Sequence, residues 1–193
     1  MKFHVIAALC TALCFAAGSA SASSIGVFFA PDASDCDLTL TEPGTITWYI
    51  CGILGGDPAA GGVTGAEFRQ IGTPEGWFAA VAPNSNAGVA LGNPLGGGCN
   101  IAFPACQEGQ SGVLLLYTIT AFAASVPGPT YLSIEPHSSP SNADFQCSLF
   151  TLCDFPDYTM FCVPGGQAII NGPSCSVGVE GTTWSHVKGL YSR

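Results

Sequence analysis

Two histidines, His137 and His186, are the side chains best suited to acid–base chemistry in the chain after residue 22. His137 lies in the segment 135–139, Glu-Pro-His-Ser-Ser, which holds a carboxylate, a histidine and a serine. Such a trio can hydrolyse substrates when the fold arranges its members in hydrogen-bonding order. No G-x-S-x-G motif accompanies it, and the nearest sequence, Gly109-Gln110-Ser111-Gly112, does not match. We therefore interpret both histidines as solvated and predict no catalytic residue.

Clustered carboxylates are the next candidates. Asp32, Asp35 and Asp37 lie in one acidic turn, and exported proteins often bind Ca²⁺ through such oxygens. The turn does not match the D-x-[DN]-x-[DN]-G spacing, so the three are weak calcium candidates and turn formation is the simpler role. The glycine run 96–98 precedes a cysteine rather than a helix. It therefore offers no phosphate cradle, and no cofactor is predicted.

Aromatic side chains offer a third possibility. Trp48, Trp77, Tyr131 and Tyr158 could form a flat face on which sugar rings stack. In a chain of this length most aromatic residues belong to the core, so a core role is the competing interpretation.

Cysteines are numerous enough to brace the fold. Eight follow residue 22, an even number that is typical of the disulfides of an exported protein. No C-x-x-C pair occurs, which argues against structural zinc. Nearness in the sequence favours the pairs Cys36–Cys51, Cys99–Cys106, Cys147–Cys153 and Cys162–Cys175. A bridge from Cys147 or Cys153 to one of the last two cysteines is an almost equal alternative.

The first 22 residues have the pattern of a secretory signal peptide. Lys2 precedes an apolar stretch at residues 5–17, and Ala20-Ser21-Ala22 is a small-x-small cleavage site. The apolar stretch is shorter than the roughly 20 residues that a membrane span needs. Cleavage after Ala22 predicts a secreted or cell-surface protein that has no membrane span.

The remaining chain is strongly acidic. Its only lysine and arginine residues are Arg69, Lys188 and Arg193, against thirteen carboxylates, so the net charge is −10. A surface with this charge repels nucleic acid and anionic membranes, and neither is an expected partner.

These residues must be positioned by strands. The uncharged run Gly112–Ala124 predicts a central strand that is buried on both faces. Residues 45–53 alternate apolar and polar side chains, as a half-buried strand does, and we expect them to form a hairpin with residues 37–41. Residues 99–106 are expected to form a small loop, and residues 145–162 an irregular segment. Further strands are predicted at residues 24–30, 63–71, 77–81, 88–91, 130–134, 167–170 and 176–180.

Turn residues recur between these strands at intervals that favour a sandwich. We predict an all-β protein with a single antiparallel β-sandwich at residues 23–181, braced by disulfides. Residues 182–193 are predicted to form a short amphipathic C-terminal helix, because Trp184, Val187 and Tyr191 have helical spacing. This helix could strap the sandwich or act as a sorting segment, and the sequence does not distinguish these roles.

The segment Val63-Thr64-Gly65-Ala66-Glu67-Phe68, together with residues 113–119, Val-Leu-Leu-Leu-Tyr-Thr-Ile, resembles the strands of cohesin-like modules. These are immunoglobulin-like β-sandwiches of bacterial extracellular proteins, and the likeness covers residues 60–125. The chain has Ile71-Gly72-Thr73-Pro74 where cohesins carry a Tyr-Asp-Pro step, and it has cysteines that cohesins do not need. The resemblance thus implies a sandwich and does not imply dockerin binding. The C-terminal residues resemble short tails of uncharacterised exported bacterial proteins.

The sequence therefore favours an exported, non-catalytic module with a structural or adhesive role at the cell surface or in the extracellular space. A module that binds a glycan or a protein is the first alternative. A secreted hydrolase that uses His137 is the second.

Overall fold

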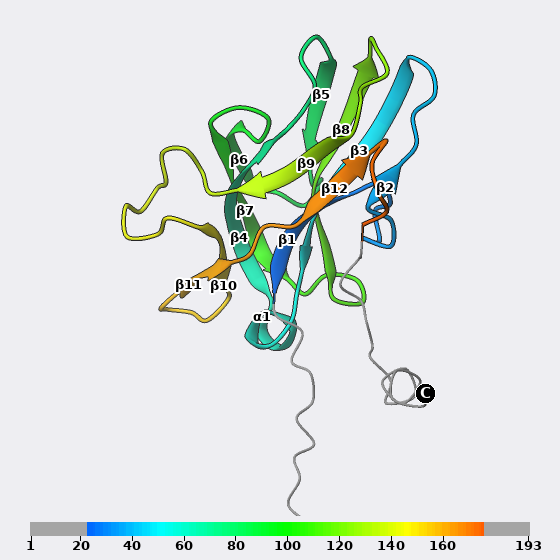
Figure 1. Ribbon diagram of the computed structural model, residues 1–193. Coiled ribbons are helices and arrows are strands. Elements are labelled where there is room, and N and C mark those ends of the chain that lie inside the picture. Colours follow the sequence, from blue (N-terminus) through cyan, green and yellow to red (C-terminus); the bar gives the residue numbers. More distant parts are fainter. Residues whose placement is uncertain (1–22, 176–193) are drawn as a thin grey trace, which may run out of the picture.

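The uncharged run after Gly112 forms strand β8, Val113–Ala123, in the interior of a four-stranded antiparallel sheet. The computed structural model describes residues 23–175, and β8 lies between two neighbours in the sheet order β1-β3-β8-β5. Figure 1 shows β3, β8 and β5 side by side behind the second sheet. The other strands of this sheet are β1 (Ser24–Phe28), β3 (Gly44–Ile53) and β5 (Phe78–Pro83).

The second sheet packs across the first and is antiparallel except for one pair. Its order is β11-β10-β4-β9-β12-β2, β7 pairs with β4 and β6, and the β12–β2 pair is parallel. Its strands are β2 (Asp37–Leu38), β4 (Val63–Ile71), β6 (Val89–Asn93), β7 (Gly98–Gln107), β9 (Thr130–Glu135), β10 (Ser148–Leu152), β11 (Met160–Val163) and β12 (Gln167–Ile170). The short helix α1, Asp57–Gly61, leads into β4. Within the described residues no helix is long and apolar enough to cross a membrane.

The core lies between the two sheets. Alternate residues of β3 and β4 point into it, because side chains alternate between the faces of a strand. Trp48 is fully buried there, and its indole Nε1 donates a hydrogen bond of 2.7 Å to the side-chain oxygen of Gln70. Gln70 in turn donates to the Thr73 hydroxyl at 3.0 Å. Trp48 and Gln70 therefore satisfy each other's polar groups, which keeps the cost of burying these two side chains low.

A β-bulge changes which side chains of β8 face the core. Ile50 pairs with Tyr117 and Cys51 pairs with Leu115, so Leu116 is the extra residue on β8. Leu116 and Tyr117 are both buried as a result. We predicted that β8 would be buried on both faces, but beyond the bulge one face is open and Phe122 is 50% exposed.

Three local predictions were wrong. The expected hairpin of residues 37–41 with residues 45–53 does not form, because β2 pairs with β12 in the other sheet. Residues 99–106 are most of strand β7 rather than a loop, since Ile101 and Phe103 alternate into the core. The segment 145–162 contains β10 and most of β11, which pair with each other.

None of the four bridges favoured by nearness in the sequence forms, whereas the alternative of a bridge from Cys147 to one of the last two cysteines is confirmed. The structure pairs Cys36 with Cys175, Cys106 with Cys153 and Cys147 with Cys162, with Cα–Cα distances of 6.0, 5.8 and 5.5 Å. Cys51 and Cys99 are buried and free. Strand pairing gives the reason. Cys36 directly precedes β2 and Cys175 follows β12, its parallel neighbour, while Cys106 and Cys153 lie at the ends of the two strands that flank Val63 of β4.

The prediction of an all-β sandwich braced by disulfides is confirmed. The predicted signal peptide at residues 1–22, the strand at 176–180 and the helix at 182–193 lie outside the described residues, as does His186. The domain limits 23–181 and 182–193 accordingly stay predictions.

Candidate functional site

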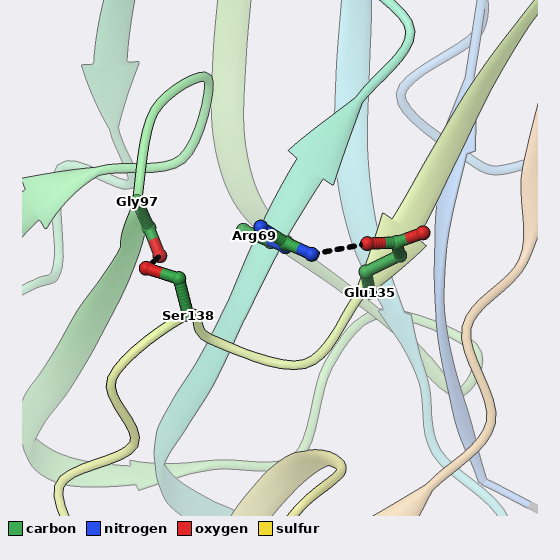
Figure 2. Close-up of polar contacts among 4 residues, drawn as sticks. All are labelled: Arg69, Gly97, Glu135 and Ser138. Atoms are coloured by element: carbon green, nitrogen blue, oxygen red, sulfur yellow. Dashed lines mark hydrogen bonds and ion pairs between the residues drawn. The ribbon is translucent and has the colours of Figure 1, made fainter.

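The residues around His137 do not form a hydrolytic triad. Glu135 accepts a hydrogen bond of 2.5 Å from the Arg69 guanidinium on β4. Ser138 donates its hydroxyl proton to the carbonyl oxygen of Gly97 at 2.6 Å, in the turn before β7. Figure 2 shows these two contacts on opposite sides of β4. Glu135 and Ser138 are therefore held by different parts of the sheet, and the side chain of neither is hydrogen-bonded to the histidine.

His137 itself fixes the same segment. Its Nδ1 accepts a hydrogen bond of 3.0 Å from the backbone N–H of Ser139. Its ring lies against Gly98, whose φ is +129°, and a Cβ built there would come within 2.3 Å of the ring Cδ2. A larger residue at position 98 would push the ring away. His137 thus helps to dock the end of β9 on the turn between β6 and β7.

Two of the three calcium candidates, Asp32 and Asp35, accept hydrogen bonds within their own turn. Asp32 accepts hydrogen bonds from the backbone N–H and the hydroxyl of Ser34, which hold the pKa of its carboxyl below the ordinary value. Asp35 accepts from the backbone N–H of Asp37. In residues 23–175 no three His, Cys, Asp or Glu side chains form a group that could hold a metal ion. The structure thus does not bring Asp32, Asp35 and Asp37 together as ligands.

The predicted aromatic face does not exist as a surface. Trp48 and Trp77 are core residues, with exposed fractions of 0% and 9%. Tyr131 lies on β9 and Tyr158 in the loop before β11, each about half exposed. The two tryptophans have no ring face free for a sugar, because the two sheets close over them.

A different face of the first sheet is open. Three cross-strand rows of β3, β8 and β5 point away from the core at the end where β8 finishes. Phe78 and Phe122 lie directly opposite each other in the outermost row, 74% and 50% exposed. We name this surface the open face. It consists of Thr45, Thr47, Tyr49, Phe78, Ala80, Ala82, Thr118, Thr120 and Phe122.

The open face carries no charge, although the described residues hold twelve carboxylates. The hydroxyls of Thr47 and Thr120 lie 3.3 Å apart across the strands. Sequence reasoning missed this face because it assigned Phe122 to a buried side of β8. The alternation of Thr45, Thr47 and Tyr49 was the available signal, since it marks one side of β3 as polar and uncharged.

The other half of the same sheet face is covered. Phe28, Cys51 and the Cys36–Cys175 bridge form a small apolar cluster there. Ile53, Val113 and Leu115 pack against it, as does Tyr49, which lies at the border between the open face and this half. Burial raises the pKa of the Cys51 thiol to about 12, with a smaller contribution from the Asp32 carboxylate. Residues 29–36 thus cover this half in part and leave Ile53, Val113 and Leu115 half-buried, whereas Phe78 and Phe122 of the open face are exposed.

Comparison with solved structures gives the fold a name. A cohesin module of a family 33 glycoside hydrolase from Clostridium perfringens superposes with a TM-score of 0.51, over 78% of this chain and 97% of that one. A type I cohesin, the seventh of ScaB from Pseudobacteroides cellulosolvens, gives 0.50 over 80% and 95%. The fold is cohesin-like.

The sequence identity to these two modules is 9% and 10%, so the likeness to cohesins concerns the fold alone. No protein-family model matches the chain, and no curated protein sequence matches it. The cohesin resemblance inferred from residues 60–125 is confirmed at the level of fold.

Proposed function

We infer that the protein is an exported, non-catalytic module that binds another protein through the open face. The observation that carries this proposal is the exposed pair Phe78 and Phe122, which lie side by side in the outermost row. Exposed aromatic side chains on a flat, uncharged surface are typical of interface centres, where they supply much of the binding energy. The small threonine and alanine side chains in the neighbouring rows leave the sheet surface accessible to a partner.

The charged residues next to the open face indicate what kind of partner surface fits it. Glu42 precedes β3 and Glu75 precedes β5, so both carboxylates lie in loops next to the outermost row of the open face. Arg69 is the only lysine or arginine in residues 23–175, and it is paired with Glu135. A fitting partner therefore has an apolar contact surface bordered by lysine or arginine side chains.

The location follows from separate observations. The signal-peptide pattern of residues 1–22 favours export, and three disulfides favour an oxidising compartment. We expect the module at the cell surface or in the extracellular medium, with a structural or adhesive role. The glycan alternative loses its support because Trp48 and Trp77 are buried, and the hydrolase alternative because Glu135 and Ser138 are engaged elsewhere.

Photo-crosslinking tests the open face directly. A benzophenone amino acid in place of Thr120 puts the reactive group in the middle of the open face, and the same group at Tyr131 is the control on β9 of the other sheet. The proposal expects one discrete adduct with a different protein from the Thr120 position in the exported fraction of the native cells. The adduct should disappear when Phe78→Thr and Phe122→Thr are added, with the melting temperature unchanged.

Three outcomes would contradict the proposal. Adducts of equal yield from both positions would show unspecific contact, and no adduct would show a free surface. An adduct whose mass corresponds to two copies of this chain would show self-association instead of a different partner. The unchanged melting temperature excludes unfolding as the reason for a lost adduct.

A further inference from the structure

A groove of about 440 Å³ crosses the second sheet on the side away from the core. Leu149, Glu67 and Asn100 form one row across β10, β4 and β7 along this groove. The next row, Phe150, Ala66 and Ile101, belongs to the core. Because successive side chains of a strand point to opposite faces, the Glu67 row faces away from the core and into the groove.

Glu67 is a buried carboxylate with one hydrogen-bond donor. It is 1% exposed, and both its oxygens accept from the backbone N–H of Ser141, at 3.2 and 3.0 Å. An ionised carboxylate can accept about four hydrogen bonds. A buried carboxylate without a compensating charge is costly, so the position favours a cation beside it.

The described part of the chain supplies no such cation. Arg69, two residues further along β4, pairs with Glu135 on β9 and not with Glu67. Residues 23–175 contain no other lysine or arginine. A positive charge next to Glu67 must therefore come from outside these residues.

The groove walls suit an alkyl chain that ends in a positive charge. Val89 and Leu91 of β6 form one side and are 49% and 62% exposed. Tyr158 and Met160 also line the groove, and the Tyr158 ring is supported edge to face by Phe155. Apolar walls cover the methylene stem of a basic side chain, and an aromatic ring attracts its charged end.

We propose that this groove binds a single lysine or arginine side chain of a protein partner, with Glu67 as its counter-ion. The acidic surface of the chain attracts such a partner at long range. The groove lies on the other sheet from the open face, so this proposal is independent of the function proposed above. A partner with a basic border could engage either surface alone.

A titration followed by ¹⁵N-resolved NMR tests the groove. The probe is the capped peptide acetyl-Ala-Lys-Ala-amide, added to the full chain without its first 22 residues. We expect shifted amide signals in β4, β7 and β10, and at least a tenfold weaker affinity for the matching norleucine peptide, because charged hydrogen bonds are the strong ones. Glu67→Gln keeps an acceptor for Ser141 and should weaken lysine-peptide binding by about tenfold or more.

Control variants separate charge from folding. Glu108→Gln removes an exposed carboxylate that does not line the groove and should leave the affinity within about twofold. Leu91→Thr changes an exposed wall residue on β6, where threonine suits a strand, and should weaken binding with a native spectrum. This variant keeps the test valid if Glu67→Gln fails to fold.

Four results would overturn the proposal. The first is that the chain binds the lysine and norleucine peptides with equal affinity. The second is that the wild type and Glu67→Gln bind the lysine peptide with equal affinity. The third is that n-butylamine binds as tightly as the peptide, which would indicate a site for small amines. The fourth is that the peptide binds only after Lys188→Ala and Arg193→Ala, which would assign the groove to the chain's own C-terminal residues.

Discussion

The covered half and the open face lie on one face of the first sheet, and they differ in how far their apolar side chains are exposed to solvent. In the covered half, Ile53, Val113 and Leu115 lie under residues 29–36 and the Cys36–Cys175 bridge. In the open face, the same strands β3 and β8 continue with threonines, and Phe122 faces solvent. On this sheet face, large aliphatic side chains occur only in the covered half. The exposed phenylalanines are therefore an exception that the fold does not explain, which is why we assign them to binding.

The covering segment has little secondary structure of its own. Residues 29–36 follow β1 and contain no strand or helix, and they are attached to the second sheet by a backbone hydrogen bond from Ile169 to Cys36 and by the bridge from Cys36. A segment with few backbone hydrogen bonds opens more readily than the sheet beneath it. The difference in solvent exposure between the covered half and the open face should thus depend on the Cys36–Cys175 disulfide.

Removing that bridge should have the largest effect. The double variant Cys36→Ala/Cys175→Ala opens a loop that spans 139 residues of sequence separation. We expect the free energy of unfolding to fall by about 4 kcal/mol, since disulfides that close long loops restrict the unfolded chain most. Urea unfolding monitored by tryptophan fluorescence measures the change, and a fall below about 1 kcal/mol would show that the cover holds without the bridge.

The matched double variant Cys147→Ala/Cys162→Ala is the control. That bridge closes a separation of 15 residues around the β10–β11 pair, far from the covered half in the strand order. Loss of this bridge should lower the free energy of unfolding by about 1–2 kcal/mol less than loss of the Cys36–Cys175 bridge does. Only the Cys36–Cys175 variant should make the Cys51 thiol reactive toward a maleimide reagent.

A pair of alanine substitutions compares the two halves on one strand. Leu115→Ala removes a half-buried side chain that packs on the covering cluster, and should cost about 2 kcal/mol. Thr120→Ala removes an exposed side chain from the open face and should change stability by no more than about 0.5 kcal/mol. Urea unfolding of both variants gives the comparison. Equal losses would mean that the two halves are packed alike.

The sequence predicted the strands better than their partners. Hydrophobic alternation in residues 45–53 and the uncharged run after Gly112 identified β3 and β8, because these patterns are local. The pairing of β2 with β12 and the bridge from Cys36 to Cys175 join the two ends of the described chain. Such contacts leave no local signal, and nearness in sequence therefore gave the wrong disulfides.

The candidate surfaces were missed for a similar reason. Phe122 was assigned to a buried side because the strand pattern was extended across the bulge at Leu116, which the sequence does not reveal. The pattern of residues 63–71 likewise does not reveal that Ser141, more than seventy positions further along the chain, covers Glu67. Whether one side of a strand is covered depends on a distant segment. The sequence thus indicated which residue types could form a site, but it did not indicate whether those residues are exposed.

The smallest effect concerns pH and the thiol that the covered half shields. Burial raises the Cys51 pKa to about 12 from its ordinary value of 9.0. Above pH 9 the unfolded chain releases this proton and the folded chain keeps it, so the free energy of unfolding must fall as the pH rises. Between pH 8 and pH 9.5 the wild type should lose about 0.8 kcal/mol more than Cys51→Ala, measured by urea unfolding at each pH.

The control variant Cys99→Ala should reduce this pH-dependent loss of stability by a similar amount, since burial also raises the Cys99 pKa to about 12. Other titrating groups are common to all three proteins and cancel. The stability of Cys51→Ala could instead depend on pH as that of the wild type does, while that of Cys99→Ala does not. The Cys51 thiol would then be in contact with water in the folded protein. The covered half would then be as accessible as the open face, and the contrast that assigns Phe78 and Phe122 to binding would no longer hold.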